Sequence, residues 1–333
     1  MSFCEVRIPT YKRPEWLRRA VNSLIAQTYP DWRAVVMDDS PENEGEGVVA
    51  DLSDSRISYT NNKNRLGGAA NLDRAFCSQS LIGGDWACVL EDDNWLMPSY
   101  LNENIRALEL HQVGVLLRNQ EVWFQTQQEV KPTGKTTRGT WFEERLYDPI
   151  ELRAYLFFFE GISNGGLFWN TQIESDLQVG ADVRDSGLQE YCRTLQIEEP
   201  LYFAAEPLCV WSDMPLDLIS RAFAGSRAYS RGIQSLLQFL IRKYGREIIE
   251  RADHLSSKLS RRAAFEVSLI DALHTDYRFQ SVTKLQTVTR YLKSYAKSIC
   301  VPDPLEDYLS KVELHSVLSP RSTEYPSTVG HLN

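Results

Sequence analysis

The chain has 333 residues, of which 43% are hydrophobic and 24% are charged, a composition typical of a globular enzyme. Its formal net charge of −9 argues against nucleic acid as a partner, because binding phosphates requires a basic surface. No run approaches the roughly 18 apolar residues of a membrane span, and the N-terminus lacks the apolar stretch of a secretion signal. We therefore expect a cytoplasmic protein.

Charge is unevenly distributed along the chain. Residues 1–217 carry 19 Lys and Arg against 34 Asp and Glu, whereas residues 218–299 carry 15 against 6. The six cysteines are scattered without a C-x-x-C pair, which is typical of reduced, buried thiols. We predict three segments: an acidic domain over 1–217, a helical domain over 218–315 and a loose tail over 316–333.

Strand and helix signals alternate through the first hundred residues. Helices are expected after Pro14 and, following a Gly-Gly turn, over 69–76. Short apolar runs predict buried strands at 3–8, 34–37, 56–59 and 86–90. Alternation of this kind predicts an α/β fold with a mainly parallel sheet flanked by helices.

The pattern from 110 onwards is mixed and then helical. Further strands are expected at 113–117, 121–125, 167–169 and 208–211, with a helix over 188–195. Beyond Leu218, apolar stripes run from Ile233 to Tyr244 and from Leu285 to Ile299 at helical spacing. We interpret both stripes as packing faces of amphipathic helices.

Polar residues follow three of the predicted strands at the point where each strand ends. These clusters are Pro9-Thr10-Tyr11, Asp38-Asp39-Ser40 and Asp92-Asp93-Asn94. Open parallel sheets bind ligands at the carboxyl ends of their strands, so the three clusters predict one crevice.

The acidic run Glu91-Asp92-Asp93 directly follows an apolar strand. Adjacent carboxylates repel one another, and a bound Mg²⁺ or Mn²⁺, which prefers oxygen ligands, relieves that repulsion. A solvated acidic loop is the alternative. In the earlier pair we expect Asp38 to cap a turn and Asp39 to accept the imide N–H of a uracil or thymine ring.

The loop after the first strand offers contacts to a nucleotide. Its short side chains let the backbone approach a ligand, Tyr11 could stack on a base, and Arg13 could meet a phosphate. A plain turn between a strand and a helix explains the same residues equally well.

Taken together, these motifs resemble family 2 glycosyltransferases of the GT-A fold. The resemblance rests on the order of four segments and on the 53 residues between Asp39 and Asp92. It covers residues 3–110 well and extends more loosely to 215. The four segments are IPTYKRPEWLRRAVNSLIAQTYPDW, VVMDDS, NRLGGAAN and WACVLEDDNWLMPSYL.

The resemblance implies a role for each matching residue. Asp39 would bind the base, Asp92 the ribose, and Asp93 the Mn²⁺ or Mg²⁺ ion, with Glu91 as a further metal candidate. The remaining nucleotide-binding candidates are Pro9, Thr10, Tyr11, Arg13 and Arg65. UDP is favoured as the nucleotide through Asp39.

Inverting members of the family use a carboxylate base in an acidic pair that opens a helix. The nearest match places Glu190 at that position, preceded by Gln189, and Asp185 is the second candidate. Such a base would take the proton from the acceptor as it attacks the anomeric carbon. A helix-surface acid is the alternative for Glu190.

The resemblance thus implies a metal-dependent, inverting, hexosyltransferase-type enzyme that moves a sugar from a UDP-sugar to a saccharide, lipid-linked or other acceptor. A sugar-phosphate nucleotidyltransferase and a non-catalytic nucleotide-binding module are the alternatives. An oxidoreductase is disfavoured because no G-x-G-x-x-G follows the first strand. The basic segment 218–299 would serve a homo-oligomer, intramolecular packing or peripheral contact with the inner membrane face.

Overall fold

The computed structural model describes residues 2–126, 128–139, 142–159, 161–162, 164–214, 227–258 and 301–318. Three sequence predictions lie outside these residues. They are the apolar stripe from Leu285 to Ile299, the domain boundary at 217 and most of the tail over 316–333.

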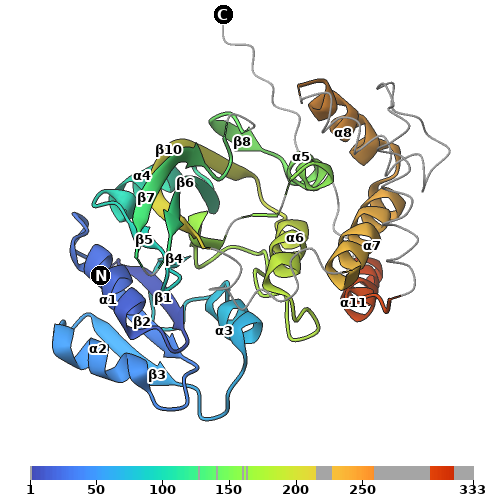
Figure 1. Ribbon diagram of the computed structural model, residues 1–333. Coiled ribbons are helices and arrows are strands. Elements are labelled where there is room, and N and C mark those ends of the chain that lie inside the picture. Colours follow the sequence, from blue (N-terminus) through green and yellow to red (C-terminus); the bar gives the residue numbers. More distant parts are fainter. Residues whose placement is uncertain are drawn as a thin grey trace, which may run out of the picture.

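The N-terminal half is a parallel sheet (Figure 1). Its central strand β1 (Cys4–Thr10) is buried along its whole length. It lies between β2 (Trp32–Asp38) and β4 (Trp86–Val89), and β3 (Ile57–Asn61) pairs with the far side of β2. Because these four strands are parallel, their carboxyl ends meet at one edge of the sheet, as the sequence predicts.

Helices cover both faces of this half. They are α1 (Pro14–Ile25), α2 (Glu44–Leu52), α3 (Gly68–Ala75) and α4 (Tyr100–His111). In α1, Pro14 occupies the first turn, where its missing N–H costs nothing. The buried residues of α1 recur at helical spacing and pack on the sheet: Leu17, Ala20, Val21 and Leu24.

The rest of the sheet mixes strand directions. The order is β3-β2-β1-β4-β9-β6-β10-β5, with β7 paired to β6 and β8 to β10. Strand β9 is antiparallel to both neighbours, whereas β6 and β10 are parallel to each other. The bounds are β5 Trp95–Leu96, β6 Val115–Gln125, β7 Val130–Thr136, β8 Arg145–Tyr147, β9 Leu167–Asn170 and β10 Leu201–Asp213.

One sequence prediction is wrong here. The two strands expected at 113–117 and 121–125 form the single strand β6, which continues through the buried polar residues Arg118, Asn119 and Gln120. Arg118 Nε donates to Asn104 Oδ1 at 2.8 Å, and Asn119 Nδ2 donates to the carbonyl of Ala205 at 3.2 Å. Because these contacts replace water, the strand need not break at its polar centre.

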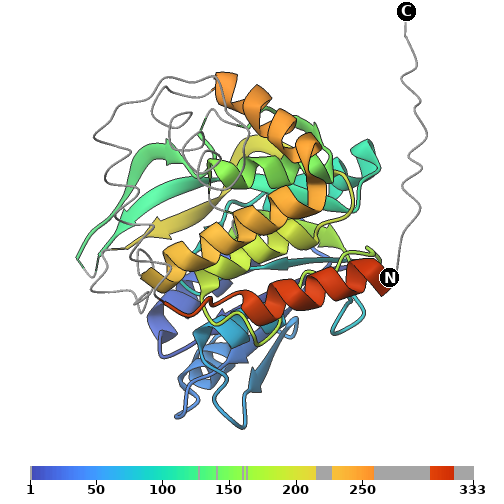
Figure 2. The same ribbon diagram turned by 90° about the vertical axis from the view of Figure 1, so that its right-hand side faces the viewer.

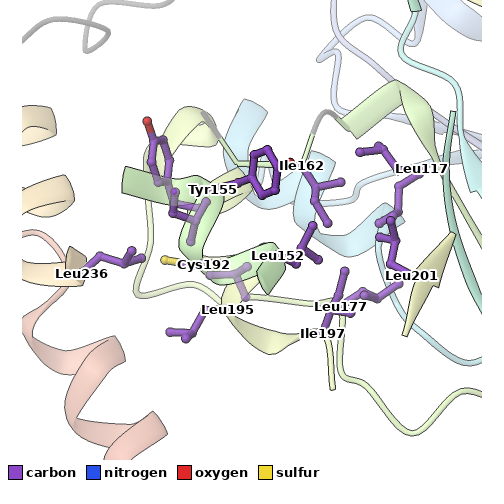
Figure 3. Close-up of a cluster of buried hydrophobic side chains, with 14 of the residues drawn as sticks. Leu117, Leu152, Tyr155, Ile162, Leu177, Cys192, Leu195, Ile197, Leu201 and Leu236 are labelled. Carbon is purple, nitrogen blue, oxygen red and sulfur yellow. The ribbon is translucent and has the colours of Figure 1, made fainter. Parts of the chain in front are cut away.

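The C-terminal helices pack on one another and share a hydrophobic core with the second half of the sheet (Figure 2). They are α5 (Pro149–Ala154), α6 (Ser186–Gln196), α7 (Arg227–Tyr244), α8 (Arg246–Lys258) and α11 (Glu306–Leu318). The apolar stripe of α7 is buried and belongs to the same hydrophobic core as Leu117 and Trp169 of the sheet. In Figure 3, Leu236 of α7 points toward Cys192 of α6, and both belong to this core. The first predicted stripe is therefore a packing face.

Candidate functional site

The carboxyl edge of the parallel strands brings the two predicted acidic pairs together. The backbone N–H of Asp39 donates to the carbonyl of Thr10 at 3.0 Å. The hydroxyl of Thr10 in turn donates to Asp92 Oδ2 at 2.8 Å. Asp39 and Asp92 are therefore separated only by the end of β1, and they share one edge of the sheet.

Asp38 holds the turn that follows β2. Its carboxylate accepts from the backbone N–H groups of Ser40 and Gly45 and from the hydroxyl of Tyr59, each at 2.9 Å. A Cβ at Gly45 would lie only 2.8 Å from Asp38 Oδ2, so this turn requires glycine. The contacts agree with the turn-capping role expected for Asp38.

Asp39 organises the glycine-rich loop before α3. It accepts from the N–H groups of Leu66 at 2.7 Å and Gly67 at 2.8 Å, and from the Asn62 side chain at 3.0 Å. Gly67 has φ of 88°, a conformation that favours glycine. The loop is thus folded around a buried carboxylate at the carboxyl edge of the sheet.

Tyr11 and Arg65 come together beside Asp39. The guanidinium of Arg65 lies 4.6 Å from the centre of the Tyr11 ring, close enough for a cation–π contact. Lys12, with φ of 55°, turns the chain sharply, and its N–H donates to Ser40 Oγ at 2.8 Å. Pro9 lies within β1 and is buried. The nucleotide candidates Pro9, Tyr11 and Arg65 therefore border the same edge.

Asp92 is buried at the centre of the site. It accepts from the Thr10 hydroxyl, from the Tyr11 N–H at 3.4 Å and from Arg13 Nη1 at 3.2 Å. Burial, with repulsion from Asp93, raises the pKa of Asp92 to about 6, although Arg13 and Thr10 oppose the rise.

Arg13 contacts both members of the acidic pair. Its Nη1 lies 3.2 Å from Asp92 Oδ1 and 3.0 Å from Asp93 Oδ2. The guanidinium also lies 4.8 Å from the centre of the Trp16 ring. Attraction by the two carboxylates outweighs burial and raises the pKa of Arg13.

The backbone of Asp93 is fixed by residues that the sequence patterns did not single out. Its carbonyl accepts from Arg19 Nη2 at 2.6 Å and from the hydroxyl of Ser212. Arg19 and Ser212 both donate to Gln125 Oε1 as well, and Arg19 lies over the Trp95 ring at 4.2 Å. Three distant segments therefore orient Asp93.

The loop after Asp93 contacts the glycine-rich segment before β9. Asn94 Nδ2 donates to Glu91 Oε2 at 3.1 Å, and Asn94 Oδ1 accepts from the Ser212 N–H at 2.9 Å. A Cβ at Gly165 would lie 2.8 Å from Gln120 Nε2 and 3.5 Å from Asn94 Nδ2. Gly165 thus allows close approach to the acidic run.

The start of α6 lies next to the same edge. The side chain of Gln189 donates to the carbonyl of Ala69, two residues after the glycine that binds Asp39, at 3.1 Å. Half-buried Glu190 follows, and its backbone packs so tightly that a Cβ at Gly161 would lie 2.2 Å from its carbonyl atoms. Gly161 therefore lies against Glu190, and Gly165 lies near Asn94.

Asp185, the second candidate base, caps α6. Its Oδ1 accepts from the N–H of Leu188 at 3.0 Å, as an N-cap side chain should. It also lines a cavity of about 340 Å³ between the α6 N-terminus, α7 and α11. The contacts of Asp185 are accounted for by helix capping.

Oxygen ligands dominate this edge. Within the described residues, no three His, Cys, Asp or Glu side chains converge as a complete metal centre. Magnesium and manganese commonly take one or two carboxylates together with substrate phosphates and water. The donor set of Asp93 and Glu91 fits such an ion.

No helix among the described residues is long and apolar enough to cross a bilayer.

Known proteins resemble the part of the chain that carries this site. Residues 5–163 match the model of glycosyl transferase family 2. The putative colanic acid biosynthesis glycosyl transferase WcaA of Escherichia coli is 27% identical over 99 residues, which cover 29% of this chain and 34% of that protein. The E. coli glucosyltransferase WfgD, named for UDP-Glc and GlcNAc-diphosphoundecaprenol, is 24% identical over 34% of this chain and 44% of its own length.

Solved structures reveal the fold. S. aureus TarS, residues 1–349, superposes with a TM-score of 0.58 at 14% identity, covering 99% of this chain and 96% of that one. Its complex with UDP-GlcNAc gives a TM-score of 0.55 at 15% identity, covering 89% and 80%. The expected GT-A fold is confirmed. The resemblance to family 2 glycosyltransferases is therefore confirmed over residues 5–163.

Proposed function

We propose that the protein transfers a hexosyl group, with inversion, from a UDP-sugar to an acceptor hydroxyl and that a divalent cation assists the transfer. One observation carries this proposal. The hydrogen bonds from Asp39 through Thr10 to Asp92, with Arg13 joining Asp92 to Asp93, span three adjacent strand ends. A nucleoside diphosphate bound along that edge would meet each acidic group in turn.

The base would bind at Asp39. Its carboxylate already accepts three hydrogen bonds, and a carboxylate offers about four acceptor positions, so one N–H of a uracil ring can be added. Tyr11 supplies an aromatic face beside it, with Arg65 on that ring. The solved TarS complex is named for UDP-GlcNAc, and that ligand agrees with UDP as the nucleotide proposed here.

The diphosphate would lie at Asp92 and Asp93. A Mn²⁺ or Mg²⁺ ion held by Asp93, with Glu91 as a further ligand, would neutralise charge on the departing diphosphate. Asp92 would accept from the ribose hydroxyls, as the family resemblance implies. Arg19 and Ser212 would keep Asp93 oriented, because they bind its carbonyl and leave its carboxylate facing the edge.

Glu190 would act as the base. It lies in α6 directly after Gln189, whose side chain binds the carbonyl of Ala69 near the loop held by Asp39. It would take the proton from the acceptor hydroxyl as that oxygen attacks the anomeric carbon. Asp185 is less favoured because it already caps the helix.

Hydrolysis and transfer assays of Asp93→Asn test the metal-assisted step. We expect UDP-sugar turnover in Mn²⁺ to fall by about 100-fold or more, because one charged ligand at the developing charge is lost. Asp51→Asn is the matched control, since Asp51 is exposed and its ion pair with Arg18 lies on the surface. Equal turnover in Asp93→Asn and the control would remove the metal site from the mechanism.

The choice of nucleotide is tested by thermal shift. UDP, GDP and dTDP are each added with Mn²⁺, and UDP is expected to raise the melting temperature most. A larger shift with GDP would contradict the base-binding role of Asp39.

A further inference from the structure

Arg13 occupies the position that a bridging cation would take. A single nitrogen, Nη1, lies within 3.2 Å of Asp92 and 3.0 Å of Asp93. Two neighbouring carboxylates share that one positive group, and one of them, Asp93, is the proposed metal ligand. Among the described residues, every hydrogen bond of this guanidinium goes to these two carboxylates.

The other contacts of Arg13 allow it to leave. Its side chain is 27% exposed, and beyond the acidic pair it only stacks on Trp16. Arg19 is held differently, because it binds the Asp93 carbonyl, Gln125 and the Trp95 ring. Arg19 therefore contacts the loop through its backbone, whereas Arg13 contacts it through the two carboxylates.

Charge explains why Arg13 and a metal ion would exclude each other. Without a counter-cation, the buried Asp92 would lie beside Asp93 as a second negative charge in a site with little water. A divalent ion at Asp93 supplies that counter-charge but repels a guanidinium about 3 Å from the same oxygen. One cation position therefore serves two alternative occupants.

We propose that Arg13 is the resident counter-cation of the Asp92–Asp93 pair and gives way to the divalent ion when the donor binds. This inference rests on the proposed function. Arg13 lies in the loop between β1 and α1, so its released guanidinium remains close to the diphosphate that binds together with the ion. The exchange lowers the affinity of the nucleotide-free protein for the metal alone, so metal and nucleotide bind best together.

Manganese binding to Arg13→Gln tests the exchange. Free Mn²⁺ is measured by electron paramagnetic resonance with the nucleotide-free protein at pH 7.5, above the pKa of Asp92. We expect Arg13→Gln to bind Mn²⁺ about three- to tenfold more tightly than wild type, or about 0.7 to 1.4 kcal/mol. Arg18→Gln removes the same charge from an exposed ion pair on α1, the helix that follows Arg13, and should leave the affinity unchanged.

Unchanged or weaker Mn²⁺ binding by folded Arg13→Gln overturns the exchange. If that variant fails to fold, Arg13→Lys takes its place. A lysine is a point charge that cannot bridge as Arg does, so its Mn²⁺ affinity should lie above that of wild type, and an affinity below wild type overturns the proposal. Absence of Mn²⁺ binding to wild type, even with UDP, would instead refute the metal-assisted function itself.

Discussion

At the scale of single residues, Asp92 makes the metal-free site sensitive to pH. Its pKa of about 6 in the folded protein exceeds the ordinary value of 3.8 because the side chain is buried beside Asp93. The folded state therefore holds a proton that the unfolded state has lost between these two values. By linkage, the free energy of unfolding falls as pH rises from about 4 to about 6.

We expect Asp92→Asn to remove this part of the pH dependence. Between pH 4 and pH 6.5, wild type in EDTA should lose on the order of 3 kcal/mol of stability relative to the variant, at about 1.4 kcal/mol per pKa unit. Urea unfolding at several pH values measures the difference. A wild-type curve parallel to that of Asp92→Asn would contradict the raised pKa.

Sequence reasoning found the residues at strand ends and missed those that support them. Asp39, Thr10 and Asp92 follow apolar runs, so the rule for parallel sheets was enough to bring them together. Arg19 and Ser212 lie 74 and 119 residues from Asp93 and act through its backbone carbonyl. No local pattern marks such contacts, because they depend on how distant segments meet.

At the scale of elements, the segment before β9 is positioned by glycines. Gly161 packs against the α6 backbone at Glu190, and a Cβ at Gly166 would lie 2.4 Å from the Arg118 carbonyl. Backbone atoms cannot move aside as a flexible side chain can. Gly161 therefore limits how closely the chain approaches α6, and Gly166 limits how closely it approaches β6.

Gly161→Ala tests this spacing. The added methyl group must push the segment away from Glu190, so we expect a loss of about 1–3 kcal/mol in stability and at least about a tenfold loss of transfer rate. Gly47→Ala is the control, because Gly47 lies in α2 with open space around it and should gain up to about 1 kcal/mol. Full activity in Gly161→Ala would mean that the packing of Gly161 against Glu190 does not determine the geometry needed for transfer.

Strand β6 shows where element prediction fails. Its central residues Arg118 to Gln120 are polar, and for that reason the sequence predicted two strands, one on each side of them. In the folded chain, Arg118 and Asn119 bind carbonyls at the irregular stretch of β10 between Ala204 and Cys209. Such polar centres can be recognised only when the partner strand is known.

At the scale of the whole molecule, the C-terminal helices share a core with the sheet. Tyr308 of α11 donates to the carbonyl of Cys192 at 3.2 Å, and Gly232 of α7 packs against Leu188 of α6. The sequence suggested a separate helical domain over 218–315, since its charge and periodicity differ from those of the preceding residues. Composition does not reveal that α7 completes the hydrophobic core next to α6.

This shared core predicts that the described helices and the sheet unfold together. Leu240 of α7 is fully buried in the core that contains Trp169 and Phe203, so Leu240→Ala should cost about 2–5 kcal/mol. Leu314→Ala makes the same substitution on α11 at a side chain that is 60% exposed, and its effect should stay within about 0.5 kcal/mol. Urea unfolding followed by helical circular dichroism and by tryptophan fluorescence should give one coincident transition in both variants and in wild type. If Leu240→Ala instead lost helical signal well before the fluorescence changed, α7 would be an independently unfolding appendage, and the start of α6 would have to be held by the sheet alone.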